Sequence, residues 1–273
     1  MKSKIELILA TDIDGTFLFP DSDGTSSDLY KVILDNREKI LLIYVTGRGF
    51  ENIVPMLHNP SLPTPDYIIA DVGATVLKRE GEAFVPVMPM QADIAAKWPG
   101  RDCVLDRVAA IEGLQLQEVP QERRCSFLYE SSGVFKAAKQ IADALDLETL
   151  TSADKYLDFL PRGVSKGSTL MELLKVEQLP ESKVLVAGDT LNDLSLMETG
   201  YRGVVVNNGE PALKSAVAVQ NIARVTQQIY FAEHEGPNGI LEAIQYHGFD
   251  RHFAEIDTQT PSIQGDADLV IVY

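Results

Sequence analysis

The sequence predicts an α/β protein: a doubly wound, mostly parallel sheet into which a smaller α+β module is inserted. Two observations support this prediction. Short apolar segments, with the length of buried strands, alternate with segments that have the apolar spacing of helices. Most of the apolar segments end in acidic, hydroxyl or glycine residues, as expected where the carboxyl ends of parallel strands form a ligand site. The predicted strands of this sheet are residues 5–10, 40–45, 67–70, 184–187 and 202–206.

Composition and charge argue against several classes of protein. With 273 residues, of which 45% are hydrophobic, the chain can form one large domain or two modest ones. A net charge of −16 argues against nucleic acid or an anionic membrane surface as a partner, because both attract clustered Lys and Arg. Cys103 and Cys125 form neither a disulfide framework nor a zinc pattern, which favours a reducing compartment. We see no signal peptide after Met1 and no apolar run long enough to cross a bilayer, so we expect a cytoplasmic protein.

The first predicted strand ends in two acids one residue apart, Asp12 and Asp14, followed by Gly15 and Thr16. Two carboxylates at a strand end either repel each other or share a cation, and hard oxygen ligands suit Mg²⁺. The chemical interpretation is that Asp12 is a nucleophile that forms an aspartyl-phosphate and that Asp14 is a general acid/base. The alternative is an Asx turn after the strand, in which Gly15 supplies the turn geometry.

The second predicted strand follows a helix expected over residues 28–39 and ends in Thr46, Gly47 and Arg48. A threonine hydroxyl beside exposed backbone amides can hold a phosphoryl oxygen. A plain turn before a helix over residues 50–57 is the alternative for this segment. The strand at 67–70 ends at Asp71 and is followed by a predicted hairpin over residues 75–85, with its turn at 78–81.

The pattern changes between residues 86 and 158, where short alternating segments and helical segments contain no strand that ends in paired acids. We interpret this part as an inserted α+β module with one sheet face open to a partner surface. The expected organisation is a discontinuous core (1–85 and 159–256), the inserted module (86–158) and a C-terminal tail (257–273). The elements expected in the module are helices at 91–98, 102–111 and 134–145 and strands at 114–117, 125–130, 148–151 and 156–160.

Two further segments after the module carry candidate site residues. Lys166 stands at the start of a predicted helix, where its charge and the helix dipole both favour a phosphoryl group. The strand at 184–187 is followed by Asp189, Asn192 and Asp193, in which the two acids form a second half for a metal site. Considered alone, Lys166 could be an ordinary solvated lysine, and the acids Asp189 and Asp193 could form the N-cap of a helix.

Taken together, these segments resemble the four motifs of the haloacid-dehalogenase-like (HAD) hydrolases, in their order. The motifs are residues 12–16, residues 46–48, Lys166 and residues 188–193. The position of the inserted module, between the second and third motifs, is similar to that of the C2-capped branch (subfamily IIB). Residues 71–74, 157–161, 202–206 and 239–244 resemble the sucrose-phosphate phosphatase group within that branch.

This resemblance implies a Rossmann-like HAD core, a C2 cap and a Mg²⁺-dependent phosphatase that hydrolyses a sugar phosphate such as sucrose-6-phosphate. It implies Asp12 as nucleophile and Asp14 as acid/base, with the phosphoryl group bound by Thr46, Gly47, Lys166 and Asn192. The implied Mg²⁺ ligands are Asp12, the backbone carbonyl of Asp14 and Asp189, with Asp193 acting through water. Candidate sugar contacts in the cap are Ser126, Tyr129 and Lys155.

Three alternatives stay open at this point. The first is a phosphotransferase related to phosphomannomutase, and the second is a phosphatase of the same branch that acts on a trehalose-, mannosylfructose- or glucosylglycerate-type phosphate. The third is a non-catalytic HAD scaffold domain, against which the presence of Asp12, Asp14, Lys166 and Asp189 argues. We expect a monomer, with a weak homodimer as the alternative, and a small-molecule sugar phosphate as the only partner.

Overall fold

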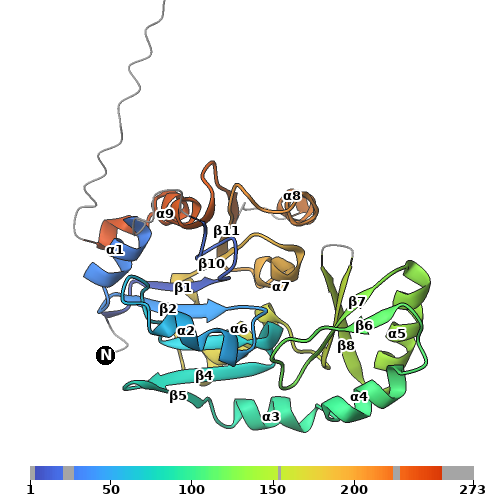
Figure 1. The fold of residues 1–273 in the computed structure, drawn as a ribbon. Coiled ribbons are helices and arrows are strands. Elements are labelled where there is room, and N and C mark those ends of the chain that lie inside the picture. The colour runs from blue at the N-terminus through green and yellow to red at the C-terminus, as the bar shows by residue number, and fades with distance from the viewer. Residues whose placement is uncertain (1–3, 21–27, 153–154, 224–227, 254–273) are drawn as a thin grey trace, which may run out of the picture.

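The computed structural model describes residues 4–20, 28–152, 155–223 and 228–253; the expected tail, residues 257–273, lies outside the described residues. The core contains an eight-stranded sheet in the order β12-β11-β10-β1-β2-β3-β4-β5 (Figure 1). Strands from β12 to β3 run parallel, and β4 and β5 add an antiparallel edge. This confirms the predicted doubly wound, mostly parallel sheet. The strands are β1 (Leu7–Thr11), β2 (Ile40–Val45), β3 (Tyr67–Ala70), β4 (Thr75–Glu80), β5 (Ala83–Pro86), β10 (Val184–Gly188), β11 (Arg202–Val205) and β12 (Ile229–Phe231).

Helices cover both faces of this sheet, which is why its central strands are continuous apolar segments. In β1, Ile8 and Ala10 face one hydrophobic cluster, whereas Leu7 and Leu9 face the other. The first cluster includes residues of α3 (Met90–Ala96), α6 (Lys166–Val176), α7 (Leu194–Met197) and α8 (Pro211–Ala223). The second includes residues of α1 (Asp28–Asp35) and α9 (Gly236–Tyr246), with partly buried residues of α2 (Val54–Leu57) packed against it.

The inserted module has its own four-stranded antiparallel sheet, in the order β6-β7-β9-β8. Its helices pack against one face of this sheet, around Phe127 and Phe159, and the other face is turned toward the core (Figure 1). The module therefore has the architecture of a cap, as the extra sheet between the second and third motifs implies. Its elements are α4 (Arg101–Val108), β6 (Leu114–Leu116), β7 (Cys125–Tyr129), α5 (Ser132–Ala144), β8 (Leu147–Ser152) and β9 (Tyr156–Pro161).

Packing suggests limits for the cap that differ slightly from residues 86 and 158. Met90 and Ile94 of α3 belong to the hydrophobic cluster of the core, and β9 continues the cap sheet to Pro161. We therefore propose cap boundaries near residues 97 and 161. Each crossing between core and cap contains a glycine with positive φ, Gly100 (+100°) and Gly163 (+73°), and a Cβ at either position would have no neighbour within 4 Å.

Several elements differ from their expected extent. The helix expected over residues 28–39 ends at Asp35, and the helix expected over 50–57 is a 3-10 turn, Phe50–Asn52, followed by the single turn of α2. The hairpin turn lies at Gly81 and Glu82, slightly later than expected. No helix in the described part of the chain is long and apolar enough to cross a membrane.

Candidate active site

Asp12 and Asp14 separate immediately after β1. Asp12 is 5% exposed, whereas the side chain of Asp14 is 56% exposed at the mouth of the site. Gly15 allows this turn, because its φ is +80° and a Cβ there would lie 2.2 Å from Asp189 Oδ2. Thr16 then donates a hydrogen bond to Asp189 Oδ1 at 2.9 Å. The first motif thus directs one acid inward and joins β1 to the end of β10.

Lys166 is a fully buried cation at the first position of α6. The helix begins there because Ser165 and Ser168 form a capping box around its first turn. Burial alone would lower the pKa of Lys166, but the charges of Asp12 and Asp193 outweigh this effect and raise it. The ammonium group donates to Asp12 Oδ1 (2.7 Å), Asn192 Oδ1 (2.7 Å) and Asp193 Oδ1 (2.6 Å).

Asp193 uses both of its carboxylate oxygens within the protein. While Oδ1 accepts from Lys166, Oδ2 accepts from the backbone N–H groups of Asp189 (3.0 Å) and Thr190 (3.1 Å). Asp193 therefore fixes the loop after β10 and the position of Lys166. Because both oxygens are engaged within the protein, we propose that Asp193 supports the site and does not bind a cation directly.

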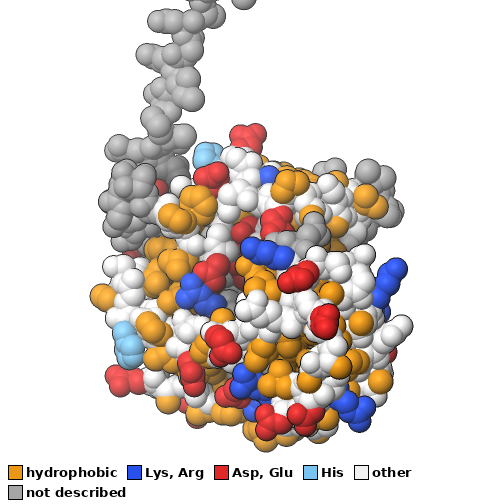
Figure 2. All heavy atoms as spheres, turned by 45° about the vertical axis from the view of Figure 1, so that its right-hand side comes forward, with side chains coloured by type: hydrophobic (Ala, Val, Ile, Leu, Met, Phe, Trp, Pro, Cys, Tyr) orange, Lys and Arg blue, Asp and Glu red, His pale blue; other side chains and the backbone are white. Residues whose placement is uncertain are grey.

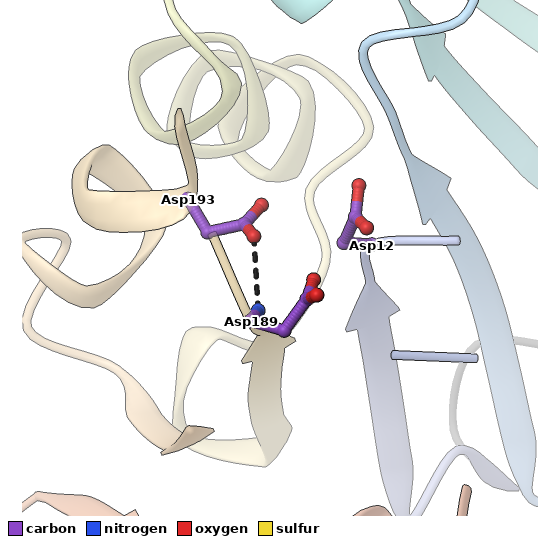
Figure 3. Close-up of side chains that lie close together, drawn as sticks. All are labelled: Asp12, Asp189 and Asp193. Atoms are coloured by element: carbon purple, nitrogen blue, oxygen red, sulfur yellow. Dashed lines mark hydrogen bonds between the residues drawn. The ribbon is translucent and has the colours of Figure 1, made fainter. Parts of the chain in front are cut away.

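Three carboxylates form a compact cluster where β1 and β10 end (Figure 3): Asp12, Asp189 and Asp193 each offer one oxygen, all within 4.8 Å of one another. Burial, with repulsion between these acids, raises the pKa of Asp12 to about 8 and that of Asp189 to about 7. A cation bound here would relieve this repulsion, and the all-oxygen donor set suits Mg²⁺. The carboxylate of Asp14 lies outside the cluster, so a cation could use only its backbone carbonyl.

Arg48 holds the exposed carboxylate of Asp14. Its Nε and Nη2 donate to the two oxygens of Asp14 at 2.7 and 2.5 Å, and these bonds raise the pKa of Arg48. Arg48 was not among the predicted site residues. The signal was present, because Asp14 and Arg48 follow neighbouring parallel strands that pair in register up to Thr11 and Tyr44.

Thr46 and Gly47 line the cavity above Asp12, and the loop after β3 supports them. The backbone N–H of Val72 donates to Thr46 O (3.1 Å), and that of Asp71 donates to Arg48 O (2.9 Å). Asp71 and Val72 both adopt left-handed conformations, with φ of 50° and 57°. For a β-branched residue such as Val72 this is a true outlier, of the kind that concentrates at functional sites.

The cap closes one side of the cavity, which has a volume of about 280 Å³. Gln117, Arg124 and Ser126 reach it from the cap, so Ser126 lies where the sequence expected a sugar contact. Tyr129 instead packs against Phe135, with ring centroids 5.9 Å apart, because it faces the helices of the cap. Lys155 lies against the ring of Tyr156, with Nζ 4.8 Å from the centroid, and is not among the residues that line the cavity. The full lining is Asp12, Asp14, Thr46, Gly47, Arg48, Gly49, Asn52, Gln117, Val119, Pro120, Arg124, Ser126, Thr190 and Asn192.

Arg124 is a buried cap residue that the sequence interpretation missed. Its side chain is 7% exposed and lies between Asp158 of the cap (Nη1 to Oδ1, 3.3 Å) and Asp71 of the core (Nε to Oδ1, 3.7 Å). No local pattern marks such a residue, because its partners are 34 and 53 positions away in the sequence. Close packing of the two parts is also visible at Gly49, where a Cβ would lie 2.3 Å from Pro120 O.

The model of the sucrose-6F-phosphate phosphohydrolase family matches residues 5–248 of the chain. Glucosylglycerol-phosphate synthase of Pseudomonas anguilliseptica is 40% identical over 98% of this chain, but the match covers 34% of that protein. The chain thus spans about a third of the length of this relative. Mannosylfructose-phosphate phosphatase of Agrobacterium fabrum is 28% identical over 89% of this chain and 97% of its own length.

A solved structure extends the likeness to both parts of the molecule. The sucrose-phosphatase from Synechocystis sp. PCC6803, determined in complex with sucrose and phosphate, has a TM-score of 0.74 and 25% sequence identity to this chain. The match covers 92% of this chain and 100% of that chain, so it includes the core and the cap. The expected resemblance to the sucrose-phosphate phosphatase group is confirmed.

Proposed function

The chain belongs to the sucrose-6F-phosphate phosphohydrolase family, a family of phosphoric monoester hydrolases, and we propose that it is a Mg²⁺-dependent phosphatase acting on a glycoside phosphate. The observation that carries this proposal is the contact between buried Lys166 and Asp12 beneath a cavity shared by core and cap. Lys166 opposes the rise in the pKa of Asp12 that burial causes, although the pKa stays raised, at about 8, without a metal ion. A cation bound beside Asp12 would lower this pKa further and so make Asp12 available as a nucleophile at the floor of the cavity.

The proposed reaction has two steps. In the first, an oxygen of Asp12 attacks phosphorus to form an aspartyl-phosphate, and protonated Asp14 donates its proton to the leaving sugar oxygen. In the second, Asp14 takes a proton from water, which attacks the aspartyl-phosphate, releases phosphate and regenerates Asp12. Asp12, Asp189 and the backbone carbonyl of Asp14 would hold Mg²⁺, which when bound would neutralise the charge of the phosphoryl oxygens.

Four residues are proposed to hold the phosphoryl group during both steps. Thr46 offers a hydroxyl directly after β2, and Gly47 and Asn192 line the same cavity. Lys166 contributes its charge, because a fully buried ammonium loses little of its field to solvent. The cap covers the reacting atoms and so limits access of water before the second step.

The names of the relatives suggest the substrate class. Glucosylglycerol phosphate, mannosylfructose phosphate and sucrose phosphate are all phosphomonoesters of a glycoside. We propose a substrate of this class, with glucosylglycerol phosphate and sucrose-6-phosphate as the first to compare. Polar side chains of the cap, including Gln117 and Ser126, line the cavity and can exchange hydrogen bonds with sugar hydroxyls.

The test is phosphate release from a panel of sugar phosphates, measured with Mg²⁺ and with EDTA. The panel contains glucosylglycerol phosphate, sucrose-6-phosphate, mannosylfructose phosphate, trehalose-6-phosphate and glucosyl-3-phosphoglycerate. We expect metal-dependent turnover that prefers one glycoside phosphate and falls by at least about 1,000-fold in Asp12→Asn. Absence of turnover by folded protein across the panel, with and without metal, would refute the proposal. Transfer of phosphate to a second sugar, in an exchange assay with glucose-1,6-bisphosphate, would instead favour the phosphotransferase.

A further inference from the structure

Asn208 follows β11 and joins two segments that are far from it and from each other in the sequence. Its Nδ2 donates to the backbone carbonyl of Gly15 at 2.8 Å, and its Oδ1 accepts from the backbone N–H of Gly236 at 2.9 Å. The first bond reaches the turn after β1, and the second reaches the first residue of α9. A side-chain amide carries a donor and an acceptor, so this one asparagine makes both bonds.

The bond to α9 anchors the side chain of Asn208. The first N–H groups of a helix have no partner within the helix, and the N-cap residue of α9, Glu235, makes no side-chain cap hydrogen bond. Asn208 supplies an acceptor from outside the helix. The start of α9 also packs against the loop after β1, because a Cβ at Gly236 would lie 2.5 Å from the Cβ of Phe19. The amide donor of Asn208 is therefore held toward this loop.

The turn after β1 depends on such external contacts. Gly15 has a φ of +80°, and a glycine restricts its own backbone less than any other residue. Its N–H donates to Leu18 O at 2.9 Å, which fixes the peptide group between Asp14 and Gly15. Because a trans peptide is planar, the carbonyl of Asp14 points in the opposite direction to this N–H. The bond from Asn208 fixes the next peptide group, so both peptide groups of Gly15 are held.

The loop after β11 (residues 206–210) also contacts the other half of the proposed cation site. The backbone N–H of Glu210 donates to Asp189 O at 2.7 Å, and its Oε2 accepts from the N–H of Leu191 at 3.0 Å. β11 lies beside β10, and β10 lies beside β1, so the loop extends past the ends of three adjacent strands. Through Asn208 and Glu210 it holds both segments that carry the proposed metal ligands.

We propose that Asn208 is a positioning residue for the phosphatase reaction, because its bond to Gly15 fixes the backbone that carries Asp14. The inference rests on the proposed function, in which Asp14 offers its carbonyl to Mg²⁺ and its carboxyl proton to the leaving oxygen. Asn208 is not among the residues that line the catalytic cavity. It therefore acts on the reaction through the turn after β1 and not by contact with the substrate.

The first test uses two substitutions that remove different bonds. Asn208→Asp keeps an acceptor for Gly236 but presents no donor to Gly15, and Asn208→Leu removes both bonds without adding charge. We expect kcat for the preferred glycoside phosphate to fall at least about tenfold in both variants, with KM within about threefold of the wild type, because the cavity lining is retained. Asn207→Asp and Asn207→Leu make the same changes at the exposed neighbouring residue and should keep the wild-type kcat. A wild-type kcat in both Asn208 variants, or equal losses in the Asn207 controls, would overturn the inference.

A second test does not depend on turnover. Calorimetric titration with Mg²⁺ alone should show about tenfold weaker binding in both Asn208 variants, because one proposed ligand, the carbonyl of Asp14, loses its fixed direction. Urea unfolding of the same samples measures the folded fraction, so a loss caused by unfolding is separated from a loss of positioning. Unaltered Mg²⁺ affinity in both variants would overturn the inference. Wild-type turnover together with unaltered Asn208 variants would leave the proposed function standing and refute only the role of Asn208, whereas a folded wild-type protein without phosphatase activity would refute the proposed function.

Discussion

Arg48 binds both carboxylate oxygens of Asp14, at 2.7 and 2.5 Å, and so fixes the side chain that we propose as the general acid/base. The guanidinium is itself fixed, because Nη1 donates to Asn52 O (3.3 Å) and contacts Met56 Sδ (3.4 Å). Asp14 is thereby held at the mouth of the cavity, separate from the buried carboxylate cluster. The side chain of Asp14 has this orientation because β1 and β2 are neighbours in the sheet, so that Arg48 after β2 lies beside Asp14 after β1.

Replacing Arg48 by alanine should lower kcat more than it lowers stability. Without its partner, the half-exposed Asp14 samples several rotamers, so we expect kcat to fall about tenfold or more. The free energy of unfolding should fall by no more than about 1 kcal/mol, because the pair is solvent-exposed. Lys139→Ala, which removes an exposed pair with Asp143 on the outer helix of the cap, is the control and should leave kcat unaltered. A wild-type kcat in Arg48→Ala would contradict the positioning role.

Lys166→Met should abolish activity and destabilise the protein. The substitution leaves Asp12 and Asp193 buried without their cation, which typically costs about 3–5 kcal/mol. Because a divalent cation can replace part of the lost charge, Mg²⁺ should restore more stability to this variant than to the wild type. Urea unfolding with and without Mg²⁺ measures both effects. Lys175→Met, on an exposed turn of the same helix, should match the wild type in both conditions.

Mg²⁺ binding should strengthen as the pH rises from about 6 to 8. In the metal-free site the pKa values of Asp12 and Asp189 are raised to about 8 and about 7, so at lower pH these groups hold protons that the cation must displace. Each displaced proton contributes about a tenfold gain in affinity per pH unit. Titration calorimetry in buffers of different ionisation enthalpy should detect release of these protons, and an affinity that is flat across this range would contradict the prediction.

The same pKa values determine the sign of the stability change in the absence of metal. Between the unfolded value near 4 and the folded values of about 7 and about 8, the folded state binds more protons than the unfolded state. The contribution of this site to stability should therefore fall as the pH rises through that window, and Mg²⁺ should reverse the trend. Urea unfolding at pH 5, 6, 7 and 8 with EDTA or Mg²⁺ tests both statements.

Gly15→Ala should remove metal binding, whereas Gly81→Ala should not. Both glycines have positive φ, +80° and +64°, so both variants bear the left-handed cost of about 1–2 kcal/mol. Only at Gly15 would the new methyl group meet Asp189 Oδ2, at 2.2 Å, while a Cβ at Gly81 has no neighbour within 4 Å. We expect at least a 100-fold loss of kcat/KM in Gly15→Ala and about wild-type activity in Gly81→Ala. Similar activity in the two variants would contradict the assignment of Asp189 as a metal ligand.

The sequence allowed the central sheet and most of its site to be predicted, because both follow from local patterns. β2 and β3 have the limits that were predicted, since each is a short apolar run that ends in polar residues. Parallel strands bring their carboxyl ends to one edge, which is why Asp12, Thr46 and Asp189 could be assigned to one place before any distance was known.

The elements that were missed depend on contacts far apart in the chain. α9 contains Gly236, Pro237 and Gly239, which locally oppose a helix, but the proline lies in the first turn and the buried face packs against α1 and β11. α8 was likewise not predicted, and β12 is only three residues long. The pair Asp71–Arg124 joins segments 53 residues apart in two different parts of the fold, so only the folded structure reveals it.

The space-filling view shows charged side chains of both signs scattered between exposed apolar ones on the face toward which the cap lies (Figure 2). Among the described residues, this face therefore carries no broad basic surface. In the proposed reaction the phosphate is therefore attracted locally, by a bound cation and by Lys166 beside Asp12.

The two unobstructed glycines at the crossings between core and cap, Gly100 and Gly163, have a mechanical consequence. Glycine has the widest range of backbone conformations, so these two connections are where the chain can most easily bend between core and cap. Lys166 follows Gly163 by three residues, but it is buried at the start of α6. Bending at the two glycines would move Arg124 and Ser126, which lie in the inserted module, relative to Lys166, which lies in the core.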